Sequence, residues 1–375
     1  METNPPTVLH VIPALNIGGA EQMLVSLVMA KRSQPFSQVV ASLMSGGALA
    51  ETIRNAGIPV HEFAMQNPRA LPFALFQLSR LITSLRPIAI QGWLYYADLA
   101  SLWALKMSGR RSATRLYWGV RSSDMDQKHY RRTLAWVIKA CSDRAAEPEA
   151  VVANSYVGRD YHRHLGYAPR AFPVIPNGID TQRFMPNSSA RSRMRAQLGI
   201  SGTTPLAIHV ARVDPMKDHE SLVSVASMLP NVQFIMVGSG TNDISGPKNL
   251  QALGARRDLA ELYPAADLAL STSAFGEGFS NVVAEAMACE VPVVATDVGD
   301  SRRIIDDTGI VVPPRDVGAM KSAIEKLLHE SKTDHENRGH AARARIVERY
   351  SLDRAVAAFD ALHLHGTLPP SDSAA

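Results

Sequence analysis

The chain has 375 residues, of which 46% are hydrophobic and 20% are charged, and its formal net charge is +4 at pH 7. This balance is that of a globular protein and excludes a disordered chain, and the length exceeds what one hydrophobic core usually organises. No apolar run reaches the roughly 20 residues that a membrane-spanning helix needs.

Short apolar segments alternate with helical patterns through the first half of the chain. We predict strands at 7–13, 39–43, 59–63, 88–91, 115–120 and 150–153. Between and after them we predict helices at 20–31, 52–55, 71–85, 97–106, 129–140 and 156–164. Buried strands that alternate with helices are typical of parallel βαβ units.

The same alternation begins again near residue 206. We predict strands at 206–210, 233–237, 250–253, 268–270 and 292–296. The predicted helices lie at 190–198, 218–228, 258–263 and 281–288, and three more close the chain at 318–329, 335–349 and 352–364. The sequence therefore predicts an α/β protein with two Rossmann-like domains whose parallel sheets face each other across a cleft. Ligands of such sheets bind at the carboxyl ends of the strands, which makes this cleft the expected site.

Turn-forming residues place the domain boundaries. Pro, Gly and Asn are frequent at 172–204, between the two alternating patterns. We assign residues 1–175 to an N-terminal domain and 176–352 to a C-terminal domain. We expect 353–368 to form a closing helix that returns toward the N-terminal domain, and 369–375 to be a frayed tail.

Charge and cysteine usage bear on partners and compartment. Residues 1–175 contain 19 Lys or Arg and 11 Asp or Glu, whereas the remaining residues contain 20 and 24. A basic first half favours contact with an anionic substrate or surface, and a well-solvated surface is the alternative. Cys141 and Cys289 lack metal-ligand spacing, which indicates reduced thiols. The first residues show no signal-peptide pattern, so we expect a cytoplasmic protein. Because the first half is basic, we also expect peripheral contact with the inner face of an anionic membrane.

The segment 275–288, FGEGFSNVVAEAMA, follows a predicted strand and opens a helix. Glycines flank Glu277, so the backbone can turn tightly and approach a ligand closely. The unsatisfied amides of the helix that starts near Ser280 form an anion site suited to a phosphate. Glu285 lies eight residues after Glu277, so both carboxylates can face one pocket and accept hydrogen bonds from sugar hydroxyls. The alternative is that Glu277 only complements the helix dipole and Glu285 is a solvated helix residue.

Two further loops carry candidate ligand contacts. Arg212 and Lys217 lie between the strand at 206–210 and the next helix, where two cations can neutralise a diphosphate. Two surface cations near a helix start are the alternative. Gly18 and Gly19 enter the first helix of the chain as a close-approach loop, although Gly-Gly is also an ordinary turn and does not complete G-x-G-x-x-G.

These segments together resemble the family 4 retaining glycosyltransferases, which have the GT-B fold. The resemblance covers nearly the whole chain. It is carried by the spacing of Glu277 and Glu285 with Gly278, Phe279 and Asn281, by Pro176–Asp180 at the domain junction, and by Gly18–Glu21. It implies an N-terminal domain on the acceptor side, a C-terminal domain that binds a nucleotide sugar, and transfer with retention of configuration.

The resemblance also implies a role for each matching residue. Arg212 and Lys217 would hold the donor diphosphate and stabilise the leaving group. Glu277 would contact the transferred sugar, and Glu285 would bind the ribose. Gly19 would approach the donor phosphate, and the loop at Gly254–Arg256 would lie against the base. The remaining donor contacts would come from Gly278 and from the backbone amides of Phe279, Ser280 and Asn281.

One position departs from the family pattern. Arg121 stands where many members carry a histidine near the sugar, so we expect Arg121, together with Gly18, to contact the acceptor or the sugar. An ion pair of Arg121 with Asp124 or Asp126 is the alternative. The D-x-D spelled by these two aspartates is interpreted as a loop coincidence. Because protein cations neutralise the diphosphate, we expect no metal and no other cofactor.

The expected activity is that of a retaining hexosyltransferase. It would move a sugar from a nucleoside diphosphate sugar to a glycan or lipid-linked acceptor in cell-surface polysaccharide biosynthesis, with no nucleic-acid partner. A GT-B nucleotide-sugar epimerase and a non-catalytic nucleotide-sugar-binding protein remain open. An NAD-dependent oxidoreductase is disfavoured because the dinucleotide fingerprint is missing.

Overall fold

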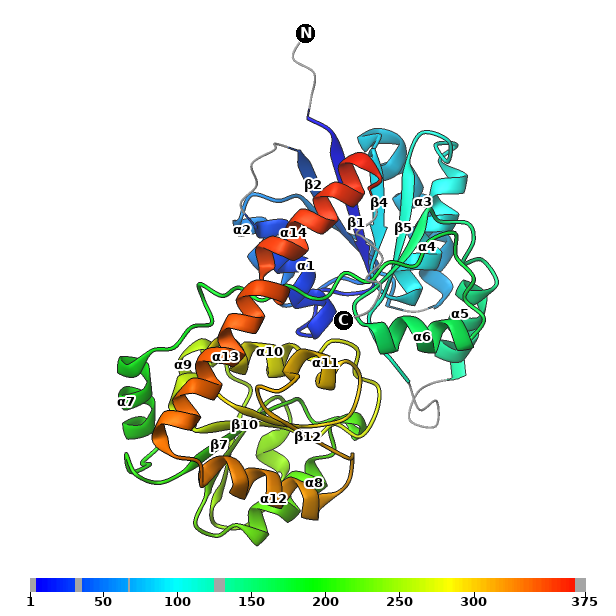
Figure 1. The fold of residues 1–375 in the computed structure, drawn as a ribbon. Coiled ribbons are helices and arrows are strands. Elements are labelled where there is room, and N and C mark those ends of the chain that lie inside the picture. The colour runs from blue at the N-terminus through cyan, green and yellow to red at the C-terminus, as the bar shows by residue number, and fades with distance from the viewer. Residues whose placement is uncertain (1–4, 31–35, 67, 125–131, 368–375) are drawn as a thin grey trace. The chain divides into compact units, whose positions relative to one another are not determined.

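The computed structural model describes residues 5–30, 36–66, 68–124 and 132–367, and the chain forms two compact units (Figure 1). The first unit ends at Gly178 and is completed by the chain from Leu352 onward, and the second consists essentially of Ile179–Ser351. The backbone N–H of Ile179 donates to the carbonyl of Tyr350 (2.8 Å), so the two crossings between the units lie side by side.

The first unit is built on a six-stranded parallel sheet in the order β3-β2-β1-β4-β5-β6. Its strands are β1 (Thr7–Ile12), β2 (Ser37–Ser42), β3 (Val60–Glu62), β4 (Ala89–Gly92), β5 (Arg115–Val120) and β6 (Ala150–Ala153). Its helices are α1 (Gly19–Met29), α2 (Ala50–Asn55), α3 (Leu71–Leu85), α4 (Tyr95–Met107), α5 (Arg132–Ser142), α6 (Tyr156–His164) and α14 (Leu352–Asp360).

Alternation along β1 explains why helices cover both faces of this sheet. Successive side chains of a strand point to opposite faces. Leu9 and Val11 lie in the core shared with α3, α4 and α5. Val8 and Ile12 lie in the core shared with α1, α2 and α14. Both faces of the sheet are therefore buried, as expected for parallel strands.

The second unit repeats the plan with a six-stranded parallel sheet in the order β12-β11-β10-β7-β8-β9. Its strands are β7 (Leu206–Val210), β8 (Gln233–Val237), β9 (Leu250–Gly254), β10 (Leu268–Ser271), β11 (Val293–Thr296) and β12 (Ile310–Val312). Its helices are α7 (Ser188–Gln197), α8 (His219–Met228), α9 (Leu259–Leu262), α10 (Asn281–Ala288), α11 (Ser301–Ile305), α12 (Val317–Leu328) and α13 (Lys332–Tyr350).

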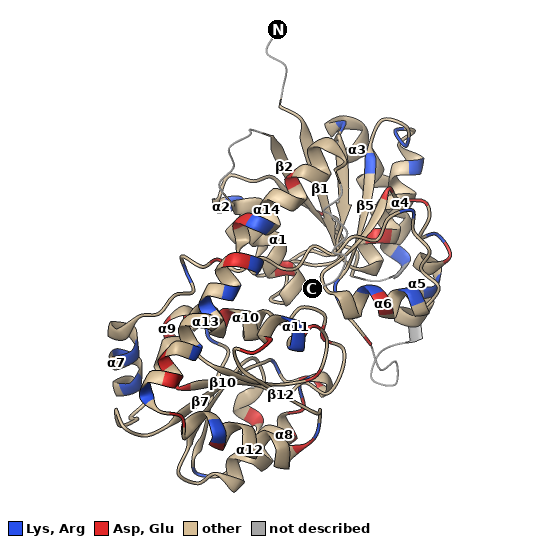
Figure 2. Ribbon diagram, viewed as in Figure 1, with Lys and Arg blue, Asp and Glu red and all other residues tan. Residues whose placement is uncertain are grey.

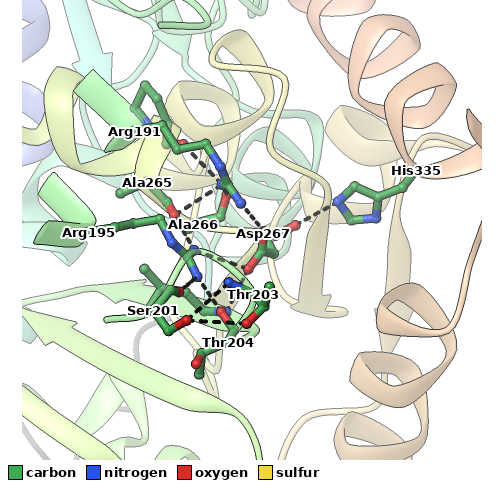
Figure 3. A network of polar contacts seen from close by, with 11 residues as sticks. Arg191, Arg195, Ser201, Thr203, Thr204, Ala265, Ala266, Asp267 and His335 are labelled. Carbon is green, nitrogen blue, oxygen red and sulfur yellow. Dashed lines mark hydrogen bonds and ion pairs between the residues drawn. The ribbon is translucent and has the colours of Figure 1, made fainter. Parts of the chain in front are cut away.

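A polar network centred on Asp267 ties four elements together at the amino ends of β7 and β10 (Figure 3). The carboxylate of Asp267 accepts from Arg191 Nη2 (2.5 Å) and from the backbone N–H of Leu206 (2.7 Å), and it lies 3.4 Å from Arg195 Nη1. Its carbonyl accepts from Nε2 of His335 (2.9 Å) on α13. The network anchors the central strands at the edge opposite to their carboxyl ends.

The expected fold class, two Rossmann-like domains with parallel sheets, is confirmed by the two sheets. Two short elements of the second unit, α11 and β12, were not predicted. β12 has three residues at the sheet edge and pairs with β11, so its apolar pattern is too short to distinguish from a loop.

The last predicted helix, at 352–364, changes character along its length. α14 ends at Asp360 and a π-helical turn follows at Ala361–His365. Arg115 Nη2 on β5 donates to the carbonyls of His363 (2.8 Å) and Leu364 (2.9 Å), which holds this end of the chain against the first sheet. The helix predicted at 129–140 begins outside the described residues, and its described part is α5. Within the described ranges, no helix is long and apolar enough to cross a membrane.

Candidate active site

The loops that follow β7, β10 and β11 meet at the carboxyl edge of the second sheet. The backbone N–H of Ala274, after β10, donates to the carbonyl of Met216, after β7 (2.7 Å). The N–H of Asp300, after β11, donates to the carbonyl of Gly278 (3.0 Å). Ligand-contacting loops are expected at this edge, and here they are fastened to one another.

Lys217 and Glu277 form an ion pair across these loops. Lys217 ends a short 3-10 turn at Pro215–Lys217, and its Nζ contacts Oε1 of Glu277. The Ser273 hydroxyl donates to the same oxygen (2.7 Å). The Glu277 side chain is 10% exposed and that of Lys217 is 16% exposed, so both charges are largely removed from water. Two residues singled out separately in the sequence are thus brought into direct contact.

Two linked hydrogen bonds hold the backbone of Lys217 in place. The Thr272 hydroxyl donates to the carbonyl of Lys217 (2.7 Å), and Nε2 of His209 lies 3.1 Å from the same hydroxyl oxygen. Because the hydroxyl proton is directed at Lys217, His209 must donate from Nε2, which fixes its neutral tautomer. Burial holds the pKa of His209 well below its ordinary value, and nearby His219 and Lys217 lower it further.

Arg212 lies on the same loop as Lys217 but contacts a different group. Its guanidinium is half-exposed, and Nη2 donates to Oδ2 of Asp214 (2.9 Å). The other carboxylate oxygen of Asp214 accepts from the N–H of Met216 (3.1 Å) and caps the 3-10 turn. The structure therefore holds Arg212 at this edge of the sheet, next to Asp214 and not against the Lys217–Glu277 pair.

The predicted anion site lies at the start of α10. Ser280 is its N-cap residue and Asn281 its first residue. The Ser280 hydroxyl makes no cap hydrogen bond, and its buried oxygen has no partner among the described residues. The Phe279 ring packs against Tyr350 in the core (5.3 Å between ring centroids), which leaves only its backbone for a ligand. A buried hydroxyl without a partner at a helix start is a feature that a bound anion would satisfy.

The loop after β11 passes so close to the backbone of Glu277 and Gly278 that position 299 requires glycine. Gly299 has φ +61°, and a Cβ there would lie 2.5 Å from the carbonyl oxygens of both Glu277 and Gly278. The close approach fixes the backbone on either side of the Glu277 side chain. The Gly278 position is thereby set by backbone packing.

Glu285 lies on α10, about one helical turn after its first residue, Asn281. The Tyr263 hydroxyl donates to its Oε2 (3.1 Å). Burial raises the pKa of Glu285 to about 7, while the Tyr263 hydrogen bond and the charge of Arg183 oppose the shift. A carboxylate kept in an unfavourable setting is a feature of binding sites as well as of structural networks.

Gly254 ends β9 with a left-handed backbone, φ +64°. Its N–H donates to the Thr241 hydroxyl (3.2 Å), and a Cβ there would lie 2.7 Å from Nδ2 of Asn242. Beyond it, Arg256 forms two hydrogen bonds to Asp258 (2.8 and 2.5 Å). The loop suggested for base contact is thus tightly turned and internally paired.

Gly18 and Gly19 begin α1 in the first unit. Gly18 is the N-cap residue with an extended backbone and no side-chain cap. A Cβ at Gly18 would lie 2.4 Å from Oε2 of Glu21. The Glu21 carboxylate therefore lies beside Gly18 at the first turn of α1.

Arg121 follows β5 in the same unit and is buried. Its guanidinium lies 4.3 Å from the Trp93 ring and 5.6 Å from the Phe359 ring of α14. Nη1 donates to Oδ1 of Asn177 (3.3 Å). Burial lowers the pKa of Arg121 to about 9, and the charge of Asp98 opposes the shift. Nε and Nη2 of Arg121 have no hydrogen-bond partner in the described part of the chain.

Of the two aspartates considered as partners of Arg121, Asp126 lies outside the described residues. Of the two aspartates of the D-x-D, the structure describes Asp124 alone, so the D-x-D interpretation stays a prediction.

Two family models match the chain. The model described as Glycosyltransferase Family 4 matches residues 17–183, and the model described as Glycosyl transferases group 1 matches residues 204–330. Together they cover most of the chain and every strand of the two sheets except β1. The chain belongs to the family 4 glycosyltransferases.

This family 4 glycosyltransferase is similar to curated proteins over part of their length. It is 32% identical over 178 residues to the D-inositol 3-phosphate glycosyltransferase of Mycobacterium sp. (strain KMS), which is 43% of this chain and 40% of that protein. It is 30% identical over 223 residues to the GDP-mannose-dependent monoacylated alpha-(1-6)-phosphatidylinositol monomannoside mannosyltransferase of Corynebacterium glutamicum, 53% of this chain and 58% of that protein. The chain spans about half the length of the curated relatives it matches.

Solved structures share the fold of the glycosyltransferase over nearly its whole length. Anabaena Alr3699/HepE in complex with UDP and glucose superposes with a TM-score of 0.83 at 22% identity, covering 96% of this chain and 100% of the other. Sucrose-phosphate synthase from Thermosynechococcus elongatus gives 0.80 at 20% identity, covering 96% and 98%. At this identity the likeness establishes the GT-B architecture.

Sequence reasoning did not single out Ser273, Thr272 and His209 of the glycosyltransferase. A usable signal was present, because three hydroxyl residues, Ser271–Ser273, come directly after a buried apolar strand. Polar residues at a strand's carboxyl end are the expected supports of a site in this fold. Within the described residues, no group of three or more His, Cys, Asp or Glu side chains is arranged to hold a metal ion.

Proposed function

We propose that this protein is a retaining glycosyltransferase that transfers a sugar from a nucleoside diphosphate sugar to a glycan or lipid-linked acceptor. The observation that carries the proposal is the buried Lys217–Glu277 pair beside the uncapped start of α10. A cation and a helix start at this sheet edge suit the diphosphate of such a donor, and a carboxylate suits the hydroxyls of its sugar.

The comparisons support the substrate class. The Anabaena structure contains UDP and glucose, and the Corynebacterium relative is named for a GDP-mannose donor and a phosphatidylinositol mannoside acceptor. We therefore propose a nucleotide-sugar donor and an acceptor that is a glycan or is attached to a lipid. A role in cell-surface polysaccharide biosynthesis at the cytoplasmic face of a membrane follows from that choice of acceptor.

The proposed reaction breaks the bond between the anomeric carbon and the β-phosphate oxygen. Negative charge develops on the departing diphosphate, where Lys217, Arg212 and the amides of Ser280 and Asn281 would stabilise it. Glu277 would exchange its contact with Lys217 for hydrogen bonds to the sugar hydroxyls, which positions the anomeric carbon. The acceptor hydroxyl attacks from the same face and passes its proton to the departing phosphate oxygen, so configuration is retained. No metal or other cofactor takes part in this proposal.

The remaining predicted residues complete the assignment. Glu285 would hold the ribose, the loop from Gly254 would lie against the base, and Gly19 would approach the donor phosphate. Gly18 and Arg121 are assigned to the acceptor side or the sugar. Since the Arg121 guanidinium is buried against Trp93, its contact with a ligand requires that the unpartnered Nε or Nη2 become accessible.

A donor screen followed by product analysis tests the proposal. Nucleoside diphosphate sugars would be compared for thermal stabilisation of the protein and for release of the nucleoside diphosphate, with and without EDTA. We expect one donor to be cleaved, EDTA to have no effect, and proton NMR to show the donor's anomeric configuration in the product. An inverted product would overturn retention, and the absence of cleavage with every donor and acceptor tried would overturn the transferase assignment.

A further inference from the structure

We propose that the outward faces of α3, α4 and α5 form a docking surface for an anionic phospholipid bilayer. The aromatic surface is defined here by Phe73, Phe76, Trp103, Met107 and Trp136. The proposal names a partner for the first unit and uses none of the donor-site residues of the second. It therefore extends the proposed function, whose lipid-linked acceptor would lie in the same bilayer.

α3 carries two phenylalanines that its own packing leaves uncovered. Phe73 is 63% exposed and Phe76 is 50% exposed. Ala74, Leu78 and Ile82 of the same helix are buried against the sheet. Because residues three or four apart share a helix face, Phe73, Phe76 and the exposed Arg80 form one outward stripe.

The neighbouring helices continue this apolar face. α4 packs against both α3 and α5. Its outward side carries Trp103 and Met107, which is 54% exposed, and α5 carries Trp136, which is 78% exposed. Large side chains that are this exposed on three adjacent helices exceed the scattered apolar residues of an ordinary surface and indicate an interaction site.

Cations are interleaved with the aromatic rings. The guanidinium of Arg80 lies 6.0 Å from the Phe76 ring centre, and Lys106 Nζ and Arg144 Cζ lie 5.4 and 5.2 Å from that of Trp103. Figure 2 marks the Lys and Arg residues of these helices in blue. In the sequence from Glu62 to Glu149 there are 13 Lys or Arg and 7 Asp or Glu. Glu147 pairs with Lys106 and Asp143 pairs with Lys139, whereas Arg80 and Arg144 form no ion pair with a described residue. The surface therefore carries an excess of positive charge, which suits an anionic partner.

The mixture of rings and cations favours a bilayer over a second protein. Protein–protein interfaces are also enriched in aromatic residues, Met and Arg, but their centres are depleted in lysine and in charged residues generally. At a lipid interface, by contrast, Trp and Phe enter the boundary between headgroups and acyl chains, while Lys and Arg extend along apolar surface and keep their charges at the phosphates. The aromatic surface has the second arrangement, since Arg80, Lys106 and Arg144 each lie beside one of its rings.

Vesicle binding by the full chain tests the proposal. The protein would be sedimented with vesicles of phosphatidylcholine alone and of phosphatidylcholine mixed with phosphatidylglycerol. We expect binding only to the anionic vesicles, weakened by salt. The double variant Phe73→Ser, Trp136→Ser should bind about tenfold more weakly, because it removes two apolar anchors. The matched control is Met228→Ser, Val347→Ser, which changes two exposed apolar residues of the second unit and should bind as the unchanged protein does.

Tryptophan fluorescence supplies a second readout. Trp93 and Trp118 are fully buried, so contact with brominated lipid should quench emission from Trp103 and Trp136. Weaker quenching in the Trp136→Phe variant than in the unchanged protein supports the proposal. Three results would overturn it: equal vesicle binding by the double variant and its control, binding that ignores phosphatidylglycerol, or a concentration-dependent dimer that the double variant abolishes. Thermal stabilisation by the donor is measured in parallel and should be unchanged in both variants, so failure of the docking surface is distinguishable from failure of the donor site.

Discussion

At the scale of single residues, the site is organised around charges that are buried in pairs. Glu277 has little contact with water, and its negative charge is offset by Lys217 and by the Ser273 hydroxyl. Breaking such a pair leaves an uncompensated charge, which costs more than the pair contributes when intact. A bound diphosphate and sugar can take over both partners at once. The proposed donor would therefore have to supply new partners for both Lys217 and Glu277.

The Glu285→Gln variant tests whether the buried Glu285 carboxylate lowers the free energy of unfolding. The pKa of Glu285 is raised from 4.5 to about 7 by burial. Between these values the folded protein binds more protons than the unfolded chain, so its stability falls as pH rises, by at most about 3 kcal/mol. We expect the Gln variant to gain stability over the unchanged protein at pH 8 but not at pH 4, as measured by urea unfolding.

The same variant should lose affinity for the nucleotide. A carboxylate that accepts hydrogen bonds from the ribose contributes about 1.5–3 kcal/mol, so we expect nucleoside diphosphate binding to weaken by roughly tenfold or more in calorimetry at pH 8. Unchanged affinity would remove Glu285 from the binding site, whatever its effect on stability.

At the scale of elements, the loops after β7 and β10 act as one piece. The Thr272 hydroxyl joins them, since it donates to the Lys217 carbonyl and accepts from His209. The Thr296 hydroxyl of β11 donates to the Ser273 carbonyl (2.6 Å) and extends the connection to the next strand. The Lys217 side chain is therefore positioned by the ends of three neighbouring strands.

Thr272→Val tests this connection. Valine has nearly the same shape but neither donates nor accepts, so Lys217 loses its backbone support. We expect kcat to fall about tenfold with a smaller change in KM, because an interaction that acts on positioning is lost mainly in the transition state. Thr272→Ser keeps the hydroxyl and should recover most of the activity. Equal kinetics for the Val and Ser variants would show that the hydroxyl does not position Lys217.

At the scale of the whole molecule, the two sheets could be predicted because short apolar segments alternate regularly with helical patterns, which is typical of parallel βαβ units. The same reasoning missed β12, whose three residues are stabilised by pairing with β11 and not by any local pattern. The π-helical turn at Ala361–His365 was missed for a related reason. It depends on Arg115, which lies far away in the sequence.

The candidate site was accessible from the sequence only in part. Glycines and charges next to strand ends drew attention to Glu277, Lys217 and Arg212. The pairing of Lys217 with Glu277 depends on how separate loops pack, and no sequence spacing predicts it. Arg212 pairs instead with Asp214, two residues further along its own loop. The burial of Arg121 against Trp93 is likewise a tertiary property, since a guanidinium after a strand gives no sign of its surroundings.

The central claim is that Lys217 and the start of α10 bind a diphosphate. Calorimetry of a nucleoside diphosphate and of the matching nucleoside, on the unchanged protein, Lys217→Ala and Lys248→Ala, tests it most directly. Lys248 is an exposed lysine before β9, at the opposite edge of the sheet, and serves as the matched control.

In Lys217→Ala, the preference for the diphosphate over the nucleoside should shrink by about 10–100-fold, because a charge-assisted contact is lost and Glu277 is left facing the phosphates. Nucleoside affinity itself should hold in this variant, and Lys248→Ala should keep the full preference. A Lys217→Ala protein that is folded and still prefers the diphosphate as strongly as the unchanged protein would contradict the account.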